Sequence, residues 1–152
     1  MSIDRLRAHY GFTRTPFGRD LAPGMLHRHR SHAEAVARIT WLVAERALGV
    51  VTGEVGAGKT VAARAAVTGL DPTRHTIIYL PNPAIGTRGI YQAITRALGG
   101  VPRFHKAALI PQTGELLVAE ETERGRRVVL VVDLCRHRDY ADTGVAVVWR
   151  AA

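Results

Sequence analysis

Cysteine is nearly absent from this sequence. One of the 152 residues, Cys135, is a cysteine, so the chain can form no internal disulfide. A protein without disulfides suits a reducing compartment, and we expect a cytoplasmic location. Neither a C-x-x-C pattern nor a histidine–asparagine arrangement accompanies Cys135, so we expect this thiol to be inert.

Long apolar runs are also absent. No stretch approaches the ~18 apolar residues that indicate a membrane-spanning helix, and charged side chains recur through residues 1–20. The sequence therefore predicts neither a membrane span nor the apolar core of a signal peptide. With 47% hydrophobic and 22% charged residues, the composition is that of a globular chain with room for one domain.

Lysine is scarce, although the chain is strongly basic. The formal net charge is +8, and 19 of the 21 cationic residues are arginine. Residues 1–100 hold most of the excess, with 13 cationic residues against six acidic ones. A basic surface favours anionic partners such as nucleic acid or nucleotide phosphates. The arginine bias is equally well explained by GC-rich coding, and both interpretations stay open at this point.

Apolar strands and helices alternate along the chain. We expect a short helix near residues 3–9, helices over 35–46, 59–70, 87–98 and 113–124, and strands over 48–52, 75–80 and 127–133. Strands that are apolar throughout and separated by helices predict a parallel sheet covered by helices on both faces. The predicted fold class is therefore α/β.

Helix boundaries are expected at recognisable caps. Ser31 and Glu34 have the spacing of a capping box at the start of the helix over 35–46, and Trp41 on this helix is expected in the core. Thr87 is expected to cap the helix over 87–98, which should stop at the Gly99-Gly100 pair.

The stretch GEVGAGKT lies directly after the strand predicted over 48–52 and matches G-x-x-x-x-G-K-[ST] at every position. Glycines let the backbone turn so that its N–H groups can face a phosphate, and the following helix presents its positive end to the anion. Lys59 is expected to reach the β- and γ-phosphates, and the Thr60 hydroxyl to ligate Mg²⁺. The residues expected to bind the nucleotide are Gly53, Glu54, Val55, Gly56, Ala57, Gly58, Lys59 and Thr60.

An acidic residue follows the most hydrophobic predicted strand. Asp133 comes directly after RVVLVV, at the carboxyl end of the strand, where open α/β sheets place their ligands. We expect its carboxylate to support the same Mg²⁺ ion as Thr60.

Together these segments resemble a known family. YGFTRTPFGRD, VVTGEVGAGKT, IIYLPNPAIGTRGIYQAITRALG and RVVLVVD occur in the order seen in AAA+ P-loop ATPases of the ExeA-like and transposition-helper group. The resemblance covers about residues 8–133. It implies ATP and Mg²⁺ as ligands and homo-oligomers that close across the nucleotide site. It also implies DNA, a transposase or a secretion component as partner. By the same resemblance Phe12, Pro16 and Phe17 lie near the adenine, and the alternative that they hold the N-terminal arm on the core stays open.

The sequence departs from this family after Asp133. Relatives have D-E-A-H there, and the glutamate polarises the attacking water, whereas this chain has Leu134. Leucine cannot accept a proton, so hydrolysis is expected to be slower by about 10²- to 10⁴-fold. Asp139 and Asp142 lie downstream, but their spacing does not place either as a substitute.

Residues 134–152 match nothing in the family pattern, which predicts a truncated or frameshifted copy with a C-terminally incomplete sheet. We therefore divide the chain into an N-terminal arm (1–30), a partial P-loop core (31–133) and a divergent tail (134–152). The family's sensor strand lies between the P-loop strand and the Asp133 strand. GVAVVWR, 144–150, is β-rich, but its short connection makes insertion there difficult, and low order is expected after about residue 134.

Smaller patterns receive ordinary interpretations. His27, His29 and His32 alternate with arginines and lack a carboxylate or cysteine partner, so a solvated basic loop is expected rather than a metal site. Arg126 and Arg127 are expected to mark the solvated start of a strand.

Three functions remain open from the sequence. The first is an ATP-binding AAA+-type ATPase with doubtful hydrolysis, and the second is a non-hydrolysing nucleotide-binding remnant or interaction module. The third, a small-molecule P-loop kinase, is weaker because no acceptor-binding or lid arginine pattern is present.

Overall fold

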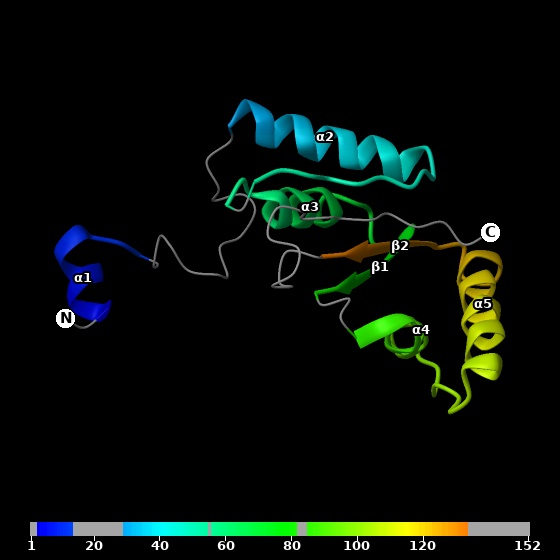
Figure 1. The fold of residues 1–152 in the computed structure, drawn as a ribbon. Helices are drawn as coiled ribbons and strands as arrows, with labels where there is room; N and C mark the ends of the chain where they lie inside the picture. The colour runs from blue at the N-terminus through cyan, green and yellow to red at the C-terminus, as the bar shows by residue number, and fades with distance from the viewer. Residues whose placement is uncertain (1–2, 14–28, 55, 82–84, 134–152) are drawn as a thin grey trace.

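The computed structural model describes residues 3–13, 29–54, 56–81 and 85–133 (Figure 1). In chain order the elements are α1 (Ile3–Tyr10), α2 (Arg30–Ala44), α3 (Lys59–Thr68), β1 (His75–Leu80), α4 (Gly86–Ala97), α5 (Lys106–Thr122) and β2 (Arg127–Val132). Helix α1 lies where the sequence predicts a short helix, and it buries none of its residues.

Strands β1 and β2 form a parallel pair. The register runs from His75 opposite Arg127 to Leu80 opposite Val132. The predicted parallel arrangement is confirmed for these two strands, and β1 has the predicted bounds. Both strands run in the same direction, so their carboxyl ends lie at one edge, where Asp133 directly follows β2.

Helices cover both faces of this strand pair, as predicted for the part of the sheet that the structure describes. On one face, α2 and α3 pack on Val129 and Val131, with Ile39, Val43, Ala62, Ala63, Ala66 and Val67 in the same core cluster. On the other face, α4 and α5 pack on Ile78, Leu80 and Leu130 through Ile94, Leu98 and Leu117. Alternate residues of β2 thus enter opposite cores, as the twofold repeat of a strand requires.

The prediction of a buried strand over 48–52 is wrong for the described residues. This segment runs back alongside α2 (Figure 1) without joining the β1–β2 ladder, and Gly53 makes a single bridge. Leu48 is 63% exposed and Val50 56% exposed, whereas Val51 packs against the α2–α3 core. An extended apolar segment becomes a strand only when a neighbouring backbone pairs with it, and no described strand pairs with residues 48–52.

Two predicted helix caps are also wrong. Helix α2 begins at Arg30 with His29 as its N-cap, and no side chain caps it. Ser31 Oγ lies 2.9 Å from His29 Nδ1, and Glu34 pairs with Arg38 at 2.5 Å, so neither side chain serves a capping box. Helix α4 starts one residue before Thr87, at Gly86, and it too lacks a side-chain cap. Ser31 and Glu34 have other local partners, and Thr87 lies inside α4 instead of at its N-cap position.

Trp41 and the start of α5 also differ from expectation. The Trp41 side chain is 61% exposed, because the face of α2 that enters the core carries Ile39 and Val43 instead. Helix α5 begins at Lys106, not near 113, and contains Pro111 within its second turn. Pro111 has no N–H to donate to the Ala107 carbonyl, so one hydrogen bond of the helix is missing there, and the helix nevertheless continues to Thr122. The predicted stop of α4 is confirmed: Leu98 is the C-cap, and Gly99 follows at φ +81°.

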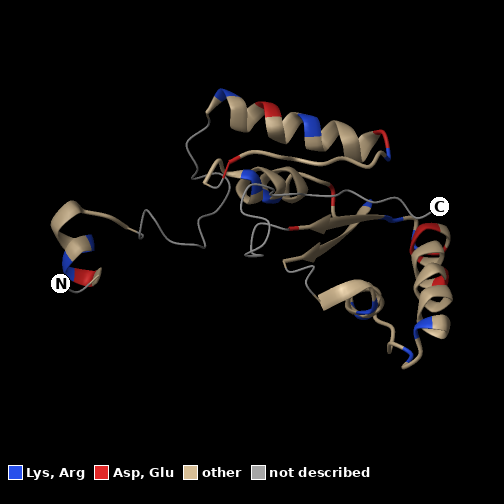
Figure 2. Cartoon of the chain, viewed as in Figure 1, with Lys and Arg blue, Asp and Glu red and all other residues tan. Residues whose placement is uncertain are grey.

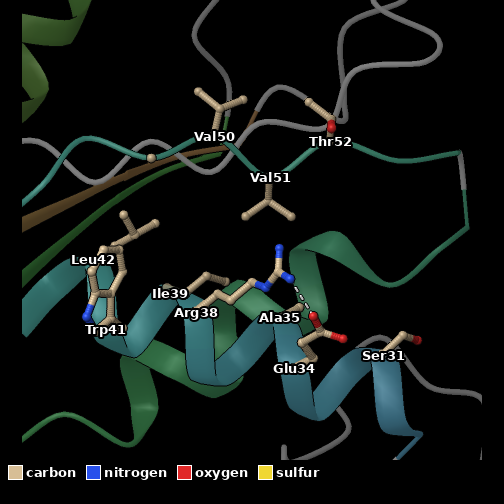
Figure 3. A pocket seen from close by; sticks show the side chains of 11 residues that line it. Ser31, Glu34, Ala35, Arg38, Ile39, Trp41, Leu42, Val50, Val51 and Thr52 are labelled. Carbon is tan, nitrogen blue, oxygen red and sulfur yellow. Dashed lines mark hydrogen bonds and ion pairs between the residues drawn. The ribbon is translucent and has the colours of Figure 1, made fainter.

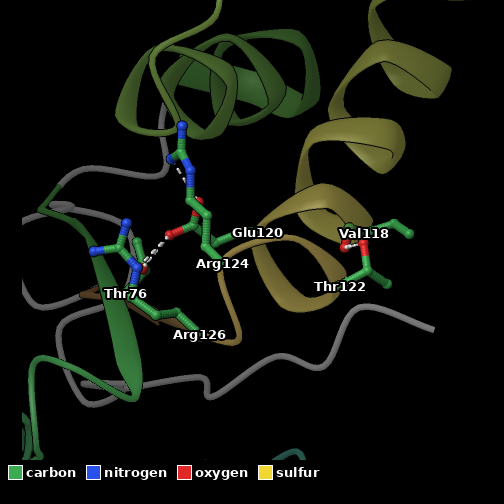
Figure 4. A network of polar contacts seen from close by, with 6 residues as sticks. All are labelled: Thr76, Val118, Glu120, Thr122, Arg124 and Arg126. Carbon is green, nitrogen blue, oxygen red and sulfur yellow. Dashed lines mark hydrogen bonds and ion pairs between the residues drawn. The ribbon is translucent and has the colours of Figure 1, made fainter.

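A polar network fastens the end of α5 to the start of β1 (Figure 4). The Glu120 carboxylate is 3% exposed and accepts hydrogen bonds from Thr76 Oγ1 at 2.6 Å and from Arg124 at 2.8 Å. Arg126 Nε lies 3.2 Å from the same carboxylate. Burial raises the pKa of Glu120, but these three partners outweigh burial and hold it below the ordinary value of 4.5. Arg126 is therefore part of a structural ion-pair network, not only a solvated strand start.

Candidate functional site

The loop before α3 holds glycines in conformations that other residues rarely adopt. Gly56 and Gly58 have φ of +86° and +83°, and Gly58 is the N-cap residue of α3. A side chain at either position would strain the backbone. The loop leads directly into Lys59, the first residue of α3, so the positive end of the helix faces the loop. Val55 lies outside the described residues.

The Lys59 ammonium bends back over this loop. Its Nζ donates hydrogen bonds to the carbonyl oxygens of Gly53 and Glu54, each at 2.6 Å. A backbone hydrogen bond from the Ala57 N–H to the Glu54 carbonyl at 3.2 Å closes a turn within the loop. An ammonium carries three N–H donors. The bonds to the Gly53 and Glu54 carbonyls use two of them and fix the position of the ammonium, which leaves one donor for an anionic ligand.

Thr60 and Asp133 meet although 73 positions separate them. Thr60 Oγ1 donates to Asp133 Oδ2 at 3.0 Å. The Asp133 side chain is 7% exposed, and its backbone N–H bonds to the Leu80 carbonyl at 2.9 Å, extending the pairing of β1 and β2 by one step. The structure thus brings together the two oxygen-bearing side chains that the sequence assigned to one ion.

Tyr79 is a residue that the sequence interpretation missed. Its hydroxyl donates a short hydrogen bond to the same Asp133 Oδ2, and the Arg64 guanidinium of α3 lies 5.9 Å from the centre of its ring. Within β1, Ile78 and Leu80 point to the α4–α5 core, so Tyr79 between them points to the α3 face. The sequence does show a tyrosine near the carboxyl end of the strand over 75–80. Only the pairing of this strand with β2 shows that the tyrosine lies next to Asp133.

A family model described as an AAA domain matches residues 43–134, more than half of the chain. The chain belongs to the AAA domain family. No curated protein and no solved structure gave a match. The matched range includes the loop, α3, β1 and Asp133, and the family assignment makes this chain a nucleotide-binding AAA-type ATPase domain.

The AAA domain also has an apolar groove beside the loop, between α2 and segment 48–52 (Figure 3). Its volume is about 660 Å³, and its walls include Ile39, Trp41, Leu42 and Val51. The segment approaches α2 so closely at Gly49 that an added Cβ would lie 2.1 Å from Leu42 Cδ1. None of the described loop residues (53, 54 and 56–60) lines this groove, so the groove is separate from the site around Lys59.

The family-based expectation for Phe12, Pro16 and Phe17 lies partly outside the described residues. Phe12 is described, and its ring stacks on Tyr10 with 5.5 Å between ring centres. Pro16 and Phe17 fall in the range 14–28, which the structure does not describe. The adenine-binding role of this segment therefore stays a prediction.

Residues 134–152 are likewise outside the described range, and with them Leu134, Cys135, Asp139, Asp142 and the segment 144–150. Among the residues that are described, no group of three His, Cys, Asp or Glu side chains could hold a metal ion. His29 and His32 lie at the start of α2, and His27 is not described. No helix in the described ranges is long and apolar enough to cross a membrane.

Proposed function

We propose that this AAA domain binds Mg-ATP between the loop over 53–60 and Asp133, and that it hydrolyses the nucleotide slowly or not at all. The observation that carries the proposal is the bond from Thr60 to Asp133 at 3.0 Å, which brings the end of the glycine-rich loop to the end of β2. These are the two positions from which a P-loop nucleotide and its ion are held.

The donor set fits a magnesium nucleotide. Lys59 offers a cation at the loop, and glycines at 56 and 58 keep side chains away from the space that phosphates would fill. The Thr60 hydroxyl and the Asp133 carboxylate are hard oxygen ligands of the kind Mg²⁺ prefers. When bound, Mg²⁺ would neutralise negative charge on the β- and γ-phosphates.

Tyr79 acts here as a positioning residue. Its hydroxyl shares Asp133 Oδ2 with Thr60, so the carboxylate stays held when the Thr60 hydroxyl turns to a metal ion. Arg64 over the Tyr79 ring steadies that ring against α3.

Slow hydrolysis follows from the residue after Asp133. Leu134 stands where the resembling ATPases have glutamate, and a leucine side chain cannot take a proton from water. A domain that binds ATP but turns it over weakly would serve as a nucleotide-dependent module in a transposition or secretion assembly. Association with other copies of the chain across the nucleotide site belongs to the same proposal.

The first test is a thermal melt of the full chain with and without Mg-ATP, beside Lys59→Ala. A ligand that binds only the native state stabilises it by about 2.7 kcal/mol at one hundred times its dissociation constant. We expect a clear upward shift of Tm for the wild type and a much smaller one for the variant. Equal shifts in both proteins, or no shift in either, would overturn the proposed site.

The second test restores the missing base with Leu134→Glu. Because a positioned general base contributes about 10²- to 10⁴-fold, ATP turnover by this variant should exceed that of the wild type by at least about 10²-fold. A double variant that also carries Lys59→Ala should lose this gain. Wild-type turnover equal to that of Leu134→Glu, and well above Lys59→Ala, would contradict slow hydrolysis while leaving ATP binding intact.

A further inference from the structure

One corner of the described chain carries positive charge without any acidic residue. No Asp or Glu occurs from residue 72 to residue 114. Arg88 on α4, Arg103 in the connection that follows, and Lys106 at the start of α5 are all exposed in this stretch. Figure 2 shows the α4–α5 connection marked in blue, while the red residues of α5 lie farther along the helix. A surface with cations alone attracts polyanions.

The same corner exposes an aromatic ring in a fixed setting. Phe104 is 74% exposed. The Arg88 guanidinium lies 4.8 Å from the centre of its ring, and the His105 ring meets it edge-on with 5.2 Å between ring centres. An arginine over a phenylalanine and an exposed ring among cations form the combination on which nucleobases stack in single-strand binding proteins.

The backbone that presents Phe104 is held by hydrogen bonds to the Gln112 side chain and to α4. The Gln112 side chain on α5 accepts a hydrogen bond from the Arg103 N–H at 3.0 Å and donates one to the Val101 carbonyl at 2.9 Å. The Gly100 N–H bonds to the Thr95 carbonyl at 2.8 Å, which ties the other end of the loop to α4. A loop fixed at three points loses little conformational entropy when it binds a partner.

We infer that this surface, the Phe104 corner (Arg88, Val101, Arg103, Phe104, His105 and Lys106), binds single-stranded nucleic acid. The cations contact phosphates, and Phe104 stacks on a base. An acidic peptide would satisfy the cations but would leave the exposed ring without a planar partner. A duplex offers its phosphates but keeps its bases stacked within the helix.

The corner is separate from the proposed nucleotide site. It lies on α4 and α5, which cover one face of the sheet, whereas Lys59 and Thr60 belong to α3 on the other face. The inference therefore does not depend on ATP binding. Oligonucleotide binding measured without nucleotide tests the corner, whereas the Tm shift with Mg-ATP tests the nucleotide site, so either can fail without the other.

The test is the fluorescence anisotropy of a labelled oligothymidylate titrated with the full chain, without nucleotide, over a range of salt concentrations. Loss of one stacked base weakens binding by roughly 5- to 150-fold, so Phe104→Ala should bind at least about fivefold more weakly. Arg103→Glu should also weaken binding, and should flatten the plot of log affinity against log salt, since each phosphate contact contributes a slope of about 0.7 on single strands.

Two matched variants test whether binding depends on the Phe104 corner itself, and not on the overall positive charge or on any exposed aromatic ring. Trp41→Ala removes an exposed ring elsewhere and is the control for Phe104→Ala. Arg74→Glu makes the same charge change as Arg103→Glu, at an exposed arginine directly before β1. Both should bind the oligonucleotide within about twofold of the wild type and melt at its temperature.

Three results would overturn the inference. One is equal weakening by Arg103→Glu and Arg74→Glu, which would mean non-specific attraction to a basic protein. Another is full competition by poly-glutamate together with no effect of Phe104→Ala, which would assign the corner to acidic protein segments. The third is a concentration-dependent oligomer in sedimentation that Phe104→Ala abolishes while oligonucleotide binding stays unchanged, which would assign it to a second copy of this chain.

Discussion

Two apolar segments of similar composition have opposite fates in this molecule. RVVLVV, 127–132, is strand β2, and its Val129 and Val131 are 2% and 1% exposed. LGVVT, 48–52, is extended too, yet Val50 and Leu48 are more than half exposed. The first pairs with β1 and has helices on both faces, whereas the second packs on α2 through one side only. Apolar, β-branched sequence is thus necessary but insufficient for a buried strand, because the neighbouring backbone completes it.

The difference places the proposed site at a boundary. Tyr79 belongs to β1 and Asp133 directly follows β2, so both lie at the paired strands. The glycine-rich loop instead follows segment 48–52, which is unpaired. The bond from Thr60 to Asp133 joins the two regions. Ligands that bind between a rigid and a less supported region can strengthen the link between them, and Mg-ATP is expected to do so here.

The largest contrast is expected from truncating one valine in each segment. Val131→Ala removes fully buried methyl groups and should lower the free energy of unfolding by about 2–3 kcal/mol, whereas Val50→Ala should change it by less than about 0.5 kcal/mol. Urea unfolding of the two variants and the wild type measures both. Equal losses would mean that segment 48–52 is as well packed in solution as β2, and the contrast drawn here would be wrong.

A smaller loss of stability is expected from substituting Glu120, whose carboxylate links α5 to the start of the paired strands. Glu120→Gln keeps the shape but removes the charge that two arginines and Thr76 contact, and should cost about 2 kcal/mol at neutral pH. The pKa of Glu120 is lowered in the folded state, so its contribution is complete above 4.5 and declines as pH falls through the lower folded-state value. The difference between wild type and variant should therefore shrink in acid. Unfolding measured from neutral to acid pH tests this, and a difference that grows in acid would contradict it.

The smallest effect on stability is expected at the boundary itself. Tyr79→Phe removes one hydrogen bond to Asp133 and should cost about 1 kcal/mol. Its distinguishing readout is the Mg²⁺ concentration needed for half of the ATP-induced rise in Tm, which should increase because Asp133 is less firmly held. Tyr91→Phe, which removes a tyrosine hydroxyl on α4, is the matched control and should leave this concentration unchanged. A Tyr79→Phe curve that matches the control would show that Tyr79 supports packing alone.

Much of this fold was accessible from the sequence, because the strongest patterns were local. The strand over 75–80 and the stop of α4 at Gly99 are confirmed, since an apolar run and a glycine in left-handed conformation act within a few residues. The cap at Ser31 was wrong because Ser31 and Glu34 contact His29 and Arg38 instead, and the cap at Thr87 was wrong because α4 begins one residue earlier. Trp41 was misplaced because it was judged by its residue type, although at 3.6 residues per turn it lies on the opposite side of α2 from Ile39 and Val43.

The sequence by itself determined the glycine-rich loop, the parallel direction of the strands and Asp133 at the end of β2, because spacing and hydrophobicity act along the chain. Only the tertiary structure decided that Tyr79 also holds Asp133, that segment 48–52 stays outside the β1–β2 ladder, and that Phe104 stands exposed beneath Arg88. Each of these depends on which residues distant in sequence become neighbours. That choice is made by packing across the whole domain, not by any local preference.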